Sequence, residues 1–195
     1  MQSNPIAYSL KRPLDIVLAL GLAIPATLVL IPCAIAIALE ARANPLFIQT
    51  RVGLGQKHFR LVKLRTMPPQ TKDLPSHEVG KQSILKTGKL FRAIKFDELP
   101  QVWNVLTGDM SFVGPRPCLP VQEELIRERA ERGVYELKPG ITGPAQLAGI
   151  DMSTPRKLAE ADAAYRTGQS LTGDLGMLFR TFTGSGSGDA ATKGG

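Results

Sequence analysis

Residues 16–39 read IVLALGLAIPATLVLIPCAIAIAL, a run of 24 residues without a charged side chain. As an α-helix this run would measure about 36 Å, enough to cross a hydrocarbon core of about 30 Å. The run is too long for the apolar part of a signal peptide, and no small-residue cleavage site follows it. A buried helix of a soluble fold rarely continues this far without a polar face. The run therefore predicts a membrane protein.

The interior and the flanks of this run bear on how it meets the bilayer. Pro25 and Pro32 lie inside it, and each proline removes a helical hydrogen bond and favours a kink. Lys11 and Arg12 precede the run, and Arg42 follows it. Because Lys and Arg prefer the cytoplasmic side, cations at both ends suit a segment that enters and leaves through one leaflet. From these features alone, a re-entrant hairpin and a single transmembrane span are equally open.

The net charge of +7 is concentrated in one part of the chain. Residues 41–95 hold 12 basic and 2 acidic side chains, whereas residues 96–195 hold 10 basic and 13 acidic ones. Such a cationic segment is expected to meet an anionic partner, such as phosphate groups, nucleic acid or acidic lipid. The two cysteines and two histidines show no ligand spacing, which argues against a disulfide framework and a structural zinc site.

Beyond the apolar run, short strand-like stretches and helices are expected. A Gly-Leu-Gly turn at 53–55 separates strand-like residues 46–48 from 59–64, which predicts a β-hairpin. Residues 84–96 suit a basic amphipathic helix lying on an anionic bilayer, and an ordinary packed helix fits equally well. The remaining expectations are a polar loop at 67–81, rigid non-helical chain at 112–117, and helices at 99–106, 121–132, 154–166 and 174–182.

An adjacent pair of carboxylates, Asp97 and Glu98, is the first candidate for chemistry. The chain has no P-loop, GxGxxG, HExxH or GxSxG motif. Neighbours on a helix diverge by about 100°, so the two carboxylates would divide the work, one attacking and one holding a divalent cation. A pair at a helix start is also a common capping device. Arg92 and the proline-flanked Arg116 favour the chemical interpretation, because arginine forks grip phosphate oxygens.

Two stretches in register, FDELPQ at 96–101 and NVLTGDMSFVGPRP at 104–117, carry a resemblance to a known family. They are similar to the signature of the bacterial sugar transferases, the monotopic phosphoglycosyl transferases. The similarity continues in Lys11-Arg12-x-x-Asp15, Gln49-x-Arg51-x-Gly53, Lys63-Leu64-Arg65-Thr66-Met67, Pro139-Gly140-Ile141-Thr142-Gly143, Asp162-x-x-Tyr165 and Ser170-Leu171-x-x-Asp174-Leu175, and so covers nearly the whole chain.

This resemblance implies an enzyme that moves a sugar 1-phosphate from a UDP-sugar to undecaprenyl phosphate and releases UMP. Asp97 matches the nucleophile that forms a covalent aspartyl phosphosugar, and Glu98 matches the residue that binds Mg²⁺. Lys63, Arg92 and Arg116 match positions assigned to phosphate binding or to the architecture around the carboxylates, and Asp162 matches an acidic residue near the site.

The resemblance also implies an α+β fold with a re-entrant membrane helix, amphipathic surface helices and a small hairpin, on the cytoplasmic face of the bacterial inner membrane. We expect a membrane helix at 1–40, a catalytic domain at 41–183 and a Gly/Ser-rich tail at 184–195. Family members break the helix at a Ser-Pro pair, a position that holds Thr27-Leu28 when counted from Asp15 and Leu28-Val29 when counted back from Arg51. The Thr27 hydroxyl is suited to satisfy a carbonyl freed by the break. A homodimer is left open.

A rival hypothesis is a membrane-tethered basic module that binds nucleic acid or acidic lipid. It accounts for the charge of residues 41–95 but leaves Asp97-Glu98 and the turn at 114–117 unexplained. Its aromatic residues, 6% of the chain, are too sparse for a base-stacking surface. We therefore expect the transferase, with no nucleic-acid partner.

Overall fold

The computed structural model describes residues 5–71 and 84–183. The predicted tail at 184–195 and most of the predicted loop at 67–81 lie outside the described residues. Helices and two small sheets make up the described chain, so the α+β class is confirmed. In chain order the elements are α1 (Pro5–Ala41), β1 (Leu46–Val52), η1 (Leu54–Gln56), β2 (His58–Leu64), α2 (Lys86–Ala93), η3 (Phe96–Glu98), α3 (Gln101–Thr107), β3 (Ser111–Val113), α4 (Glu123–Glu131), η4 (Val134–Glu136), β4 (Gly140–Thr142), α5 (Pro144–Leu147), α6 (Pro155–Gly168) and α7 (Leu171–Phe182).

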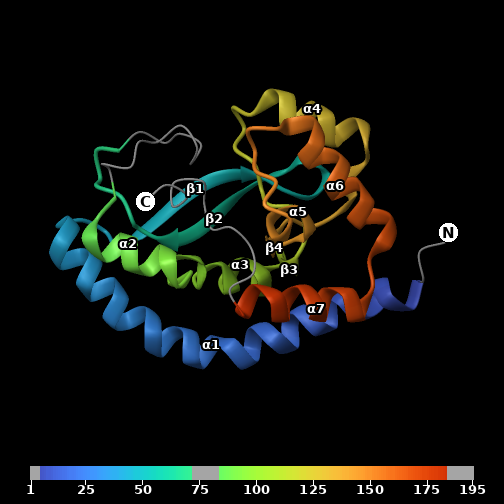
Figure 1. Ribbon diagram of the computed structural model, residues 1–195. Helices are drawn as coiled ribbons and strands as arrows, with labels where there is room; N and C mark the ends of the chain where they lie inside the picture. The colour runs from blue at the N-terminus through green and yellow to red at the C-terminus, as the bar shows by residue number, and fades with distance from the viewer. Residues whose placement is uncertain (1–4, 72–83, 184–195) are drawn as a thin grey trace.

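The apolar run lies in α1, a helix of 37 residues that measures about 55 Å along its axis. Figure 1 shows α1 as a bowed helix along one side of the molecule, with the other elements on its concave side. The helix continues through Pro25 and Pro32, so the interruption expected near residues 27–29 is absent. The Thr27 hydroxyl donates to the Ala23 carbonyl at 2.7 Å, a bond that a continuous helix allows and that favours bending.

Two faces of α1 differ in their surroundings. One face turns toward the domain and is buried, with Asp15, Ala19, Ala26, Cys33 and Ile37 among its residues. Large apolar residues at spacings of three or four turn outward and are 54–75% exposed, namely Val17, Leu20, Ile24, Leu28, Ile31, Ile35 and Leu39. Among the described helices, Leu10–Ala41 alone is long and apolar enough to cross a membrane.

The first end of α1 is fastened to the domain by the Lys-Arg-x-x-Asp motif. Lys11 Nζ lies 2.5 Å from Asp174 Oδ2 on α7. The Arg12 guanidinium donates to the last carbonyls of α3, with Nη1 2.6 Å from the Val105 oxygen. Asp15 Oδ1 accepts from the Ser111 hydroxyl at 3.0 Å and from the Phe112 amide at 3.1 Å. Lys11 and Arg12, which we interpreted as flanking cations, thus bind acceptor groups of the domain.

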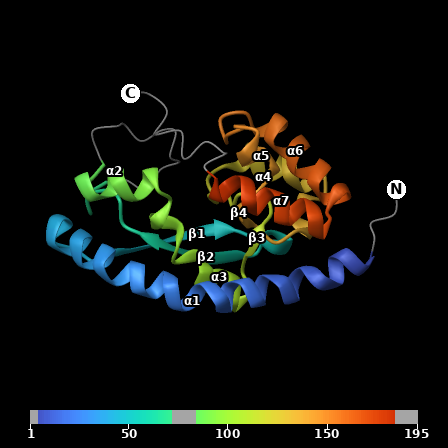
Figure 2. The ribbon, with the colours of Figure 1, turned by 60° about the horizontal axis from the view of Figure 1, so that its bottom comes forward.

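The second end of α1 is fastened through Glu40. Its carboxylate accepts from the Lys86 amide at 2.7 Å, the Thr87 amide at 2.9 Å and the Thr87 hydroxyl at 2.6 Å. Glu40 therefore satisfies the free amides at the start of α2, which has no capping side chain of its own. Both ends of α1 are attached to the same domain, and Figure 2 shows the helix extending along it.

The predicted hairpin is confirmed, with longer strands than the sequence pattern suggested. β1 and β2 pair antiparallel from Leu46 opposite Leu64 to Val52 opposite His58. The Asn104 side chain of α3 binds the free edge of β2, accepting from the Val62 amide at 3.0 Å and donating to the Arg60 carbonyl at 2.8 Å. This contact fixes α3 against the hairpin.

The second sheet joins two turns that are distant in sequence. β3 and β4 pair in parallel, and the Gly114 amide donates to the Thr142 carbonyl at 2.8 Å. A Cβ atom on Gly114 would lie 2.4 Å from the Lys138 carbonyl, and one on Gly140 would lie 2.1 Å from the Gly114 amide. Only glycine permits so close an approach of two backbones. The rigid stretch predicted at 112–117 is therefore braced by the turn that begins at Lys138.

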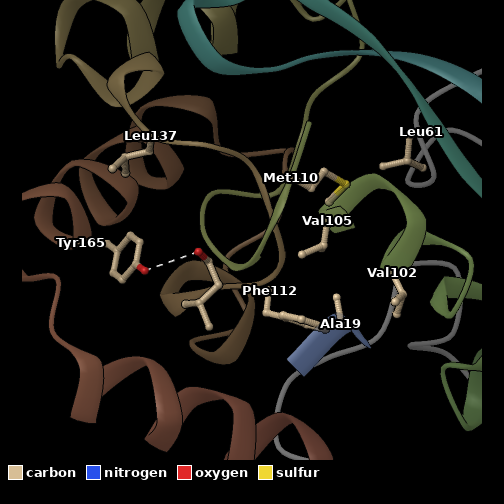
Figure 3. Close-up of a cluster of buried hydrophobic side chains, with 9 residues drawn as sticks. Ala19, Leu61, Val102, Val105, Met110, Phe112, Leu137 and Tyr165 are labelled. Atoms are coloured by element: carbon tan, nitrogen blue, oxygen red, sulfur yellow. Dashed lines mark hydrogen bonds between the residues drawn. The ribbon is translucent and has the colours of Figure 1, made fainter. Parts of the chain in front are cut away.

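The main core connects α1 with β2, α3, β3 and α6. Figure 3 shows its side chains: Ala19, Leu61, Val102, Val105, Met110, Phe112, Leu137 and Tyr165. The Tyr165 hydroxyl donates to Asp174 Oδ1 at 2.7 Å and lies 3.4 Å from the Val113 carbonyl oxygen, the contact dashed in Figure 3. Burial, with the neighbouring Asp174 carboxylate, raises the pKa of Tyr165, so its hydroxyl stays a donor. Since Ala19 is fully buried here, α1 shares a core with the residues that follow it.

Candidate active site

The carboxylate pair lies in a short 3-10 turn between α2 and α3. Lys95 adopts a left-handed conformation with φ of 58° and ends α2, and η3 then carries Asp97 and Glu98. The α-helix α3 begins only after Pro100, whose ring nitrogen offers no hydrogen. We predicted the pair at the helix N-terminus, and the structure places it one turn earlier. Pro100 is the N-cap of α3, so neither carboxylate occupies the capping position.

Glu98 and Arg116 come together across 18 positions of sequence. Arg116 Nη1 donates to Glu98 Oε1 at 2.9 Å, and the two side chains remain 28% and 19% exposed. Asp97, next to Glu98, is 6% exposed. Three of the predicted site residues are thus gathered in one place, with part of the ion pair open to solvent.

Arg92 is a buried guanidinium on α2, the helix that packs against η3. Its Nε donates to the Thr66 hydroxyl at 2.8 Å, whereas its buried Nη1 atom has no hydrogen-bond partner. Gly88 lets α2 approach this point, because a Cβ atom there would lie 2.4 Å from the Thr66 carbonyl. A buried N–H without a partner is costly, and a phosphate oxygen would satisfy it.

Lys63 lies on β2, which also contacts η3. Its Nζ is 5.4 Å from the centre of the Phe47 ring on the paired strand, and the Arg65 guanidinium is 5.7 Å from the same ring. Such cation–π contacts hold the stems of both side chains on this face of the hairpin. The phosphate-binding role of Lys63 stays a prediction.

Asp162 lies on α6 and is 1% exposed. Its Oδ2 accepts from Arg129 Nη2 at 2.7 Å and from Arg129 Nε at 3.0 Å. Burial raises the pKa of the Asp162 carboxyl, and the Arg129 guanidinium opposes that rise. Its connection to the carboxylate pair runs through Arg129, which donates from Nη1 to the Arg116 carbonyl at 2.9 Å. A direct contact of Asp162 with substrate stays a prediction.

The basic excess of residues 41–95 is partly internal. Arg51 and Arg92 are buried, and Arg65 Nε donates to the Asn44 carbonyl at 2.7 Å. Sequence reasoning assigned no role to Arg51 or Arg129, although both contact the turn that holds Arg116. For Arg129 one signal was available: it lies four residues after the buried Leu125, on the inner face of α4.

A magnesium ion fits these residues, although the described residues contain no cluster of three metal-ligating side chains. Mg²⁺ in phosphoryl-transfer sites is usually held by one or two carboxylates together with substrate phosphates and water. Glu98, partly exposed and adjacent to Asp97, supplies such a donor. The site therefore offers carboxylate oxygens for a cation and guanidinium groups for phosphate.

Comparison with known proteins shows matching sequences along most of the chain. The family model described as bacterial sugar transferase matches residues 6–186. A UDP-glucose:undecaprenyl-phosphate glucose-1-phosphate transferase of Caulobacter vibrioides is 40% identical over 182 residues, covering 88% of this chain and 67% of that protein. The uncharacterized sugar transferase EpsL of Bacillus subtilis is 39% identical, covering 88% and 85% respectively.

A more distant relative is named for a different sugar. The UDP-N-acetylgalactosamine-undecaprenyl-phosphate N-acetylgalactosaminephosphotransferase of Aeromonas hydrophila is 33% identical over 190 residues. The match covers 91% of this chain but only 44% of that protein. Each match covers so much of this chain that its aligned region must span residues 97–116.

Proposed function

Because the chain belongs to the bacterial sugar transferase family, we propose that it transfers a sugar 1-phosphate from a UDP-sugar to undecaprenyl phosphate and releases UMP. The relatives from Caulobacter and Aeromonas are named for this pair of substrates. The observation that carries the proposal is the Glu98–Arg116 pair beside the buried Asp97. It combines a candidate nucleophile, a cation ligand and a phosphate-binding group.

The proposed reaction has two displacements at phosphorus. In the first, an Asp97 carboxylate oxygen attacks the phosphorus that bears the sugar, and the bond to the UMP oxygen breaks. UMP leaves, and the phosphosugar stays bound to Asp97. In the second, a phosphate oxygen of undecaprenyl phosphate attacks the same phosphorus and the bond to Asp97 breaks. The products are undecaprenyl diphosphosugar and free carboxylate, so the kinetics are ping-pong.

The other residues manage negative charge in these steps. Arg116 and the unpartnered Nη1 of Arg92 bind phosphate oxygens, with Lys63 as a further cation on the adjoining strand. Glu98 holds Mg²⁺, which when bound neutralises charge on the donor diphosphate. The burial of Asp97 keeps bulk water away from the attacking oxygen.

We further propose that α1 enters one leaflet only, on the cytoplasmic face of the inner membrane. A helix that crossed the bilayer would carry Lys11 and Arg12 to the opposite side, away from Asp174 and the end of α3, which they contact. The helices α2, α3 and α7, which contact α1, also carry exposed apolar residues, namely Leu90, Trp103, Leu175, Phe179 and Phe182. Figure 1 shows these helices along the same side as α1.

Release of UMP tests the function directly. The purified protein is incubated with candidate UDP-sugars, Mg²⁺ and undecaprenyl phosphate, and UMP is measured. We expect UMP with at least one donor, its loss on chelation with EDTA, and recovery when Mg²⁺ is restored. Without acceptor, we expect about one UMP per enzyme and a phosphosugar adduct on Asp97 in the mass spectrum. UMP release by an Asp97→Asn variant at the wild-type rate would reject this mechanism.

A further inference from the structure

Two buried arginines hold the turn of Arg116 from behind. Arg129 on α4 donates from Nη1 to the Arg116 carbonyl at 2.9 Å. Arg51 on β1 donates from Nη1 to the next carbonyl, that of Pro117, at 3.0 Å. The two donors come from elements on different parts of the chain and meet at consecutive peptide oxygens. Neither arginine belongs to the set of residues assigned to phosphate or metal.

Each of these arginines is itself fixed by a buried partner. Arg51 Nε donates to Gln49 Oε1 at 2.9 Å, and Arg129 is bound through two nitrogens by Asp162. Burying a guanidinium is expensive, and a neutral donor would suffice merely to satisfy a carbonyl. A guanidinium held through two of its nitrogens, however, presents its remaining N–H groups in a fixed plane. The carbonyls of the turn are therefore fixed in direction as well as satisfied.

This arrangement bears on where the Arg116 side chain points. Pro115 and Pro117 flank Arg116, so the backbone torsions on either side are restricted. With its own carbonyl and the next one also held, the Cα–Cβ bond of Arg116 has a fixed direction, and Nη1 reaches Glu98 Oε1 at 2.9 Å. Reacting groups misplaced by about 1 Å can lose about 100-fold in rate.

We propose that Arg51 and Arg129 are positioning residues that aim the Arg116 guanidinium at Glu98 and the donor phosphates. The inference rests on the proposed function and deepens it. It accounts for Gln49-x-Arg51, a motif without an assigned role, and it gives the buried Asp162 a task through Arg129. A residue that only stabilises the fold would lower the amount of active protein without changing how Arg116 acts.

The test compares Arg51→Lys and Arg129→Lys with Arg132→Lys, a matched control. Arg132 follows α4 and pairs with Glu128 at 2.7 Å near the surface, without a contact to the turn. Lysine keeps the charge but lacks the planar fork. For the two positioning variants we expect kcat of UMP release to fall by about 10- to 100-fold, with KM for the UDP-sugar changed by less than about 3-fold. The control keeps the wild-type kcat.

Two further readouts separate positioning from folding. In an Arg116→Ala background, Arg51→Lys and Arg129→Lys should lower kcat by less than about 2-fold, because no guanidinium is left to aim. The Mg²⁺ concentration for half-maximal rate should fall in both lysine variants and in Arg116→Ala, because a cation that competes at Glu98 has been withdrawn. A loss of folded protein would reduce the maximal rate and leave that midpoint unchanged.

The outcomes distinguish this inference from the function on which it rests. Unchanged kcat in both lysine variants, equal losses with and without Arg116, or an unshifted Mg²⁺ midpoint would overturn the positioning role while UMP release by the wild type stands. If one lysine variant does not fold, the other decides. If neither folds, the arginines are structural and the inference is wrong. Failure of the wild type to release UMP from any UDP-sugar removes both.

Discussion

Two arginine–carboxylate pairs of similar length lie in different surroundings. Arg116 and Glu98 meet at 2.9 Å with 28% and 19% of their side chains exposed, whereas Arg129 and Asp162 meet at 2.7 Å with 2% and 1% exposed. In the more exposed pair, Arg116–Glu98 (the open pair), either side chain can exchange its partner for a phosphate or a metal ion at little cost. In the buried pair, Arg129–Asp162 (the sealed pair), neither side chain can, because each charge would remain buried without compensation. Under the proposed function, similar contacts would serve chemistry in one place and architecture in the other.

The largest expected effect is on the sealed pair. Arg129→Ala leaves the Asp162 carboxylate buried and uncompensated, which should lower the free energy of unfolding by about 3–5 kcal/mol. Burial already raises the pKa of Asp162 although Arg129 opposes the rise, so without Arg129 the folded-state pKa lies further above that of the unfolded chain, and the variant loses stability as pH rises from the unfolded-state pKa to the folded-state one. The loss should therefore be smaller at about pH 5 than at about pH 8. Urea denaturation at both pH values measures it, and equal losses would contradict the assignment.

The second effect separates activity from stability at the open pair. Arg116→Ala should lower kcat/KM for UMP release by about 100-fold, because a phosphate-binding group beside Glu98 is lost. Its free energy of unfolding should change by less than about 1 kcal/mol, since the pair is partly solvated. Steady-state kinetics and thermal unfolding of the same preparation give both values. A stability loss as large as that of Arg129→Ala would erase the distinction between the two pairs.

The smallest effect belongs to a third pair that is fully on the surface. Arg156 Nε lies 3.1 Å from Glu160 Oε1 on α6, with 76% and 53% of the side chains exposed. Arg156→Ala should change the free energy of unfolding by less than about 0.5 kcal/mol and leave UMP release unchanged. Thermal unfolding at low and high salt checks this value. A larger change would show that exposure is a poor guide to the importance of such pairs.

The elements with a strong local pattern were predictable from the sequence. The apolar run gave α1, the Gly-rich turn at 53–55 gave the hairpin, and Gly108 with φ of 91° ended α3 as expected. β3 and β4, at three residues each, are too short to show any periodicity. α1 runs as one continuous helix through Pro25 and Pro32, whereas the sequence predicted a break near residues 27–29.

The candidate site was predicted in part. Asp97, Glu98 and Arg116 were identified from their residue types and from the family resemblance, and the structure brings the last two together. Asp162 was identified in the same way, but its burial depends on Arg129, which is 33 positions away. Arg51 reaches the turn from 66 positions away. No local pattern records contacts over such distances.

The sequence by itself determined the family, the long apolar helix, the carboxylate pair and the stiff turn beside it, because these follow from residue type and short-range spacing. Only the tertiary structure decided which charges stay open and which are sealed, and that both ends of α1 attach to one domain. The physical reason is that burial is a property of the packed whole. The charge of an arginine follows from its residue type alone, whereas its burial, and with it its role, depends on the elements that pack against it.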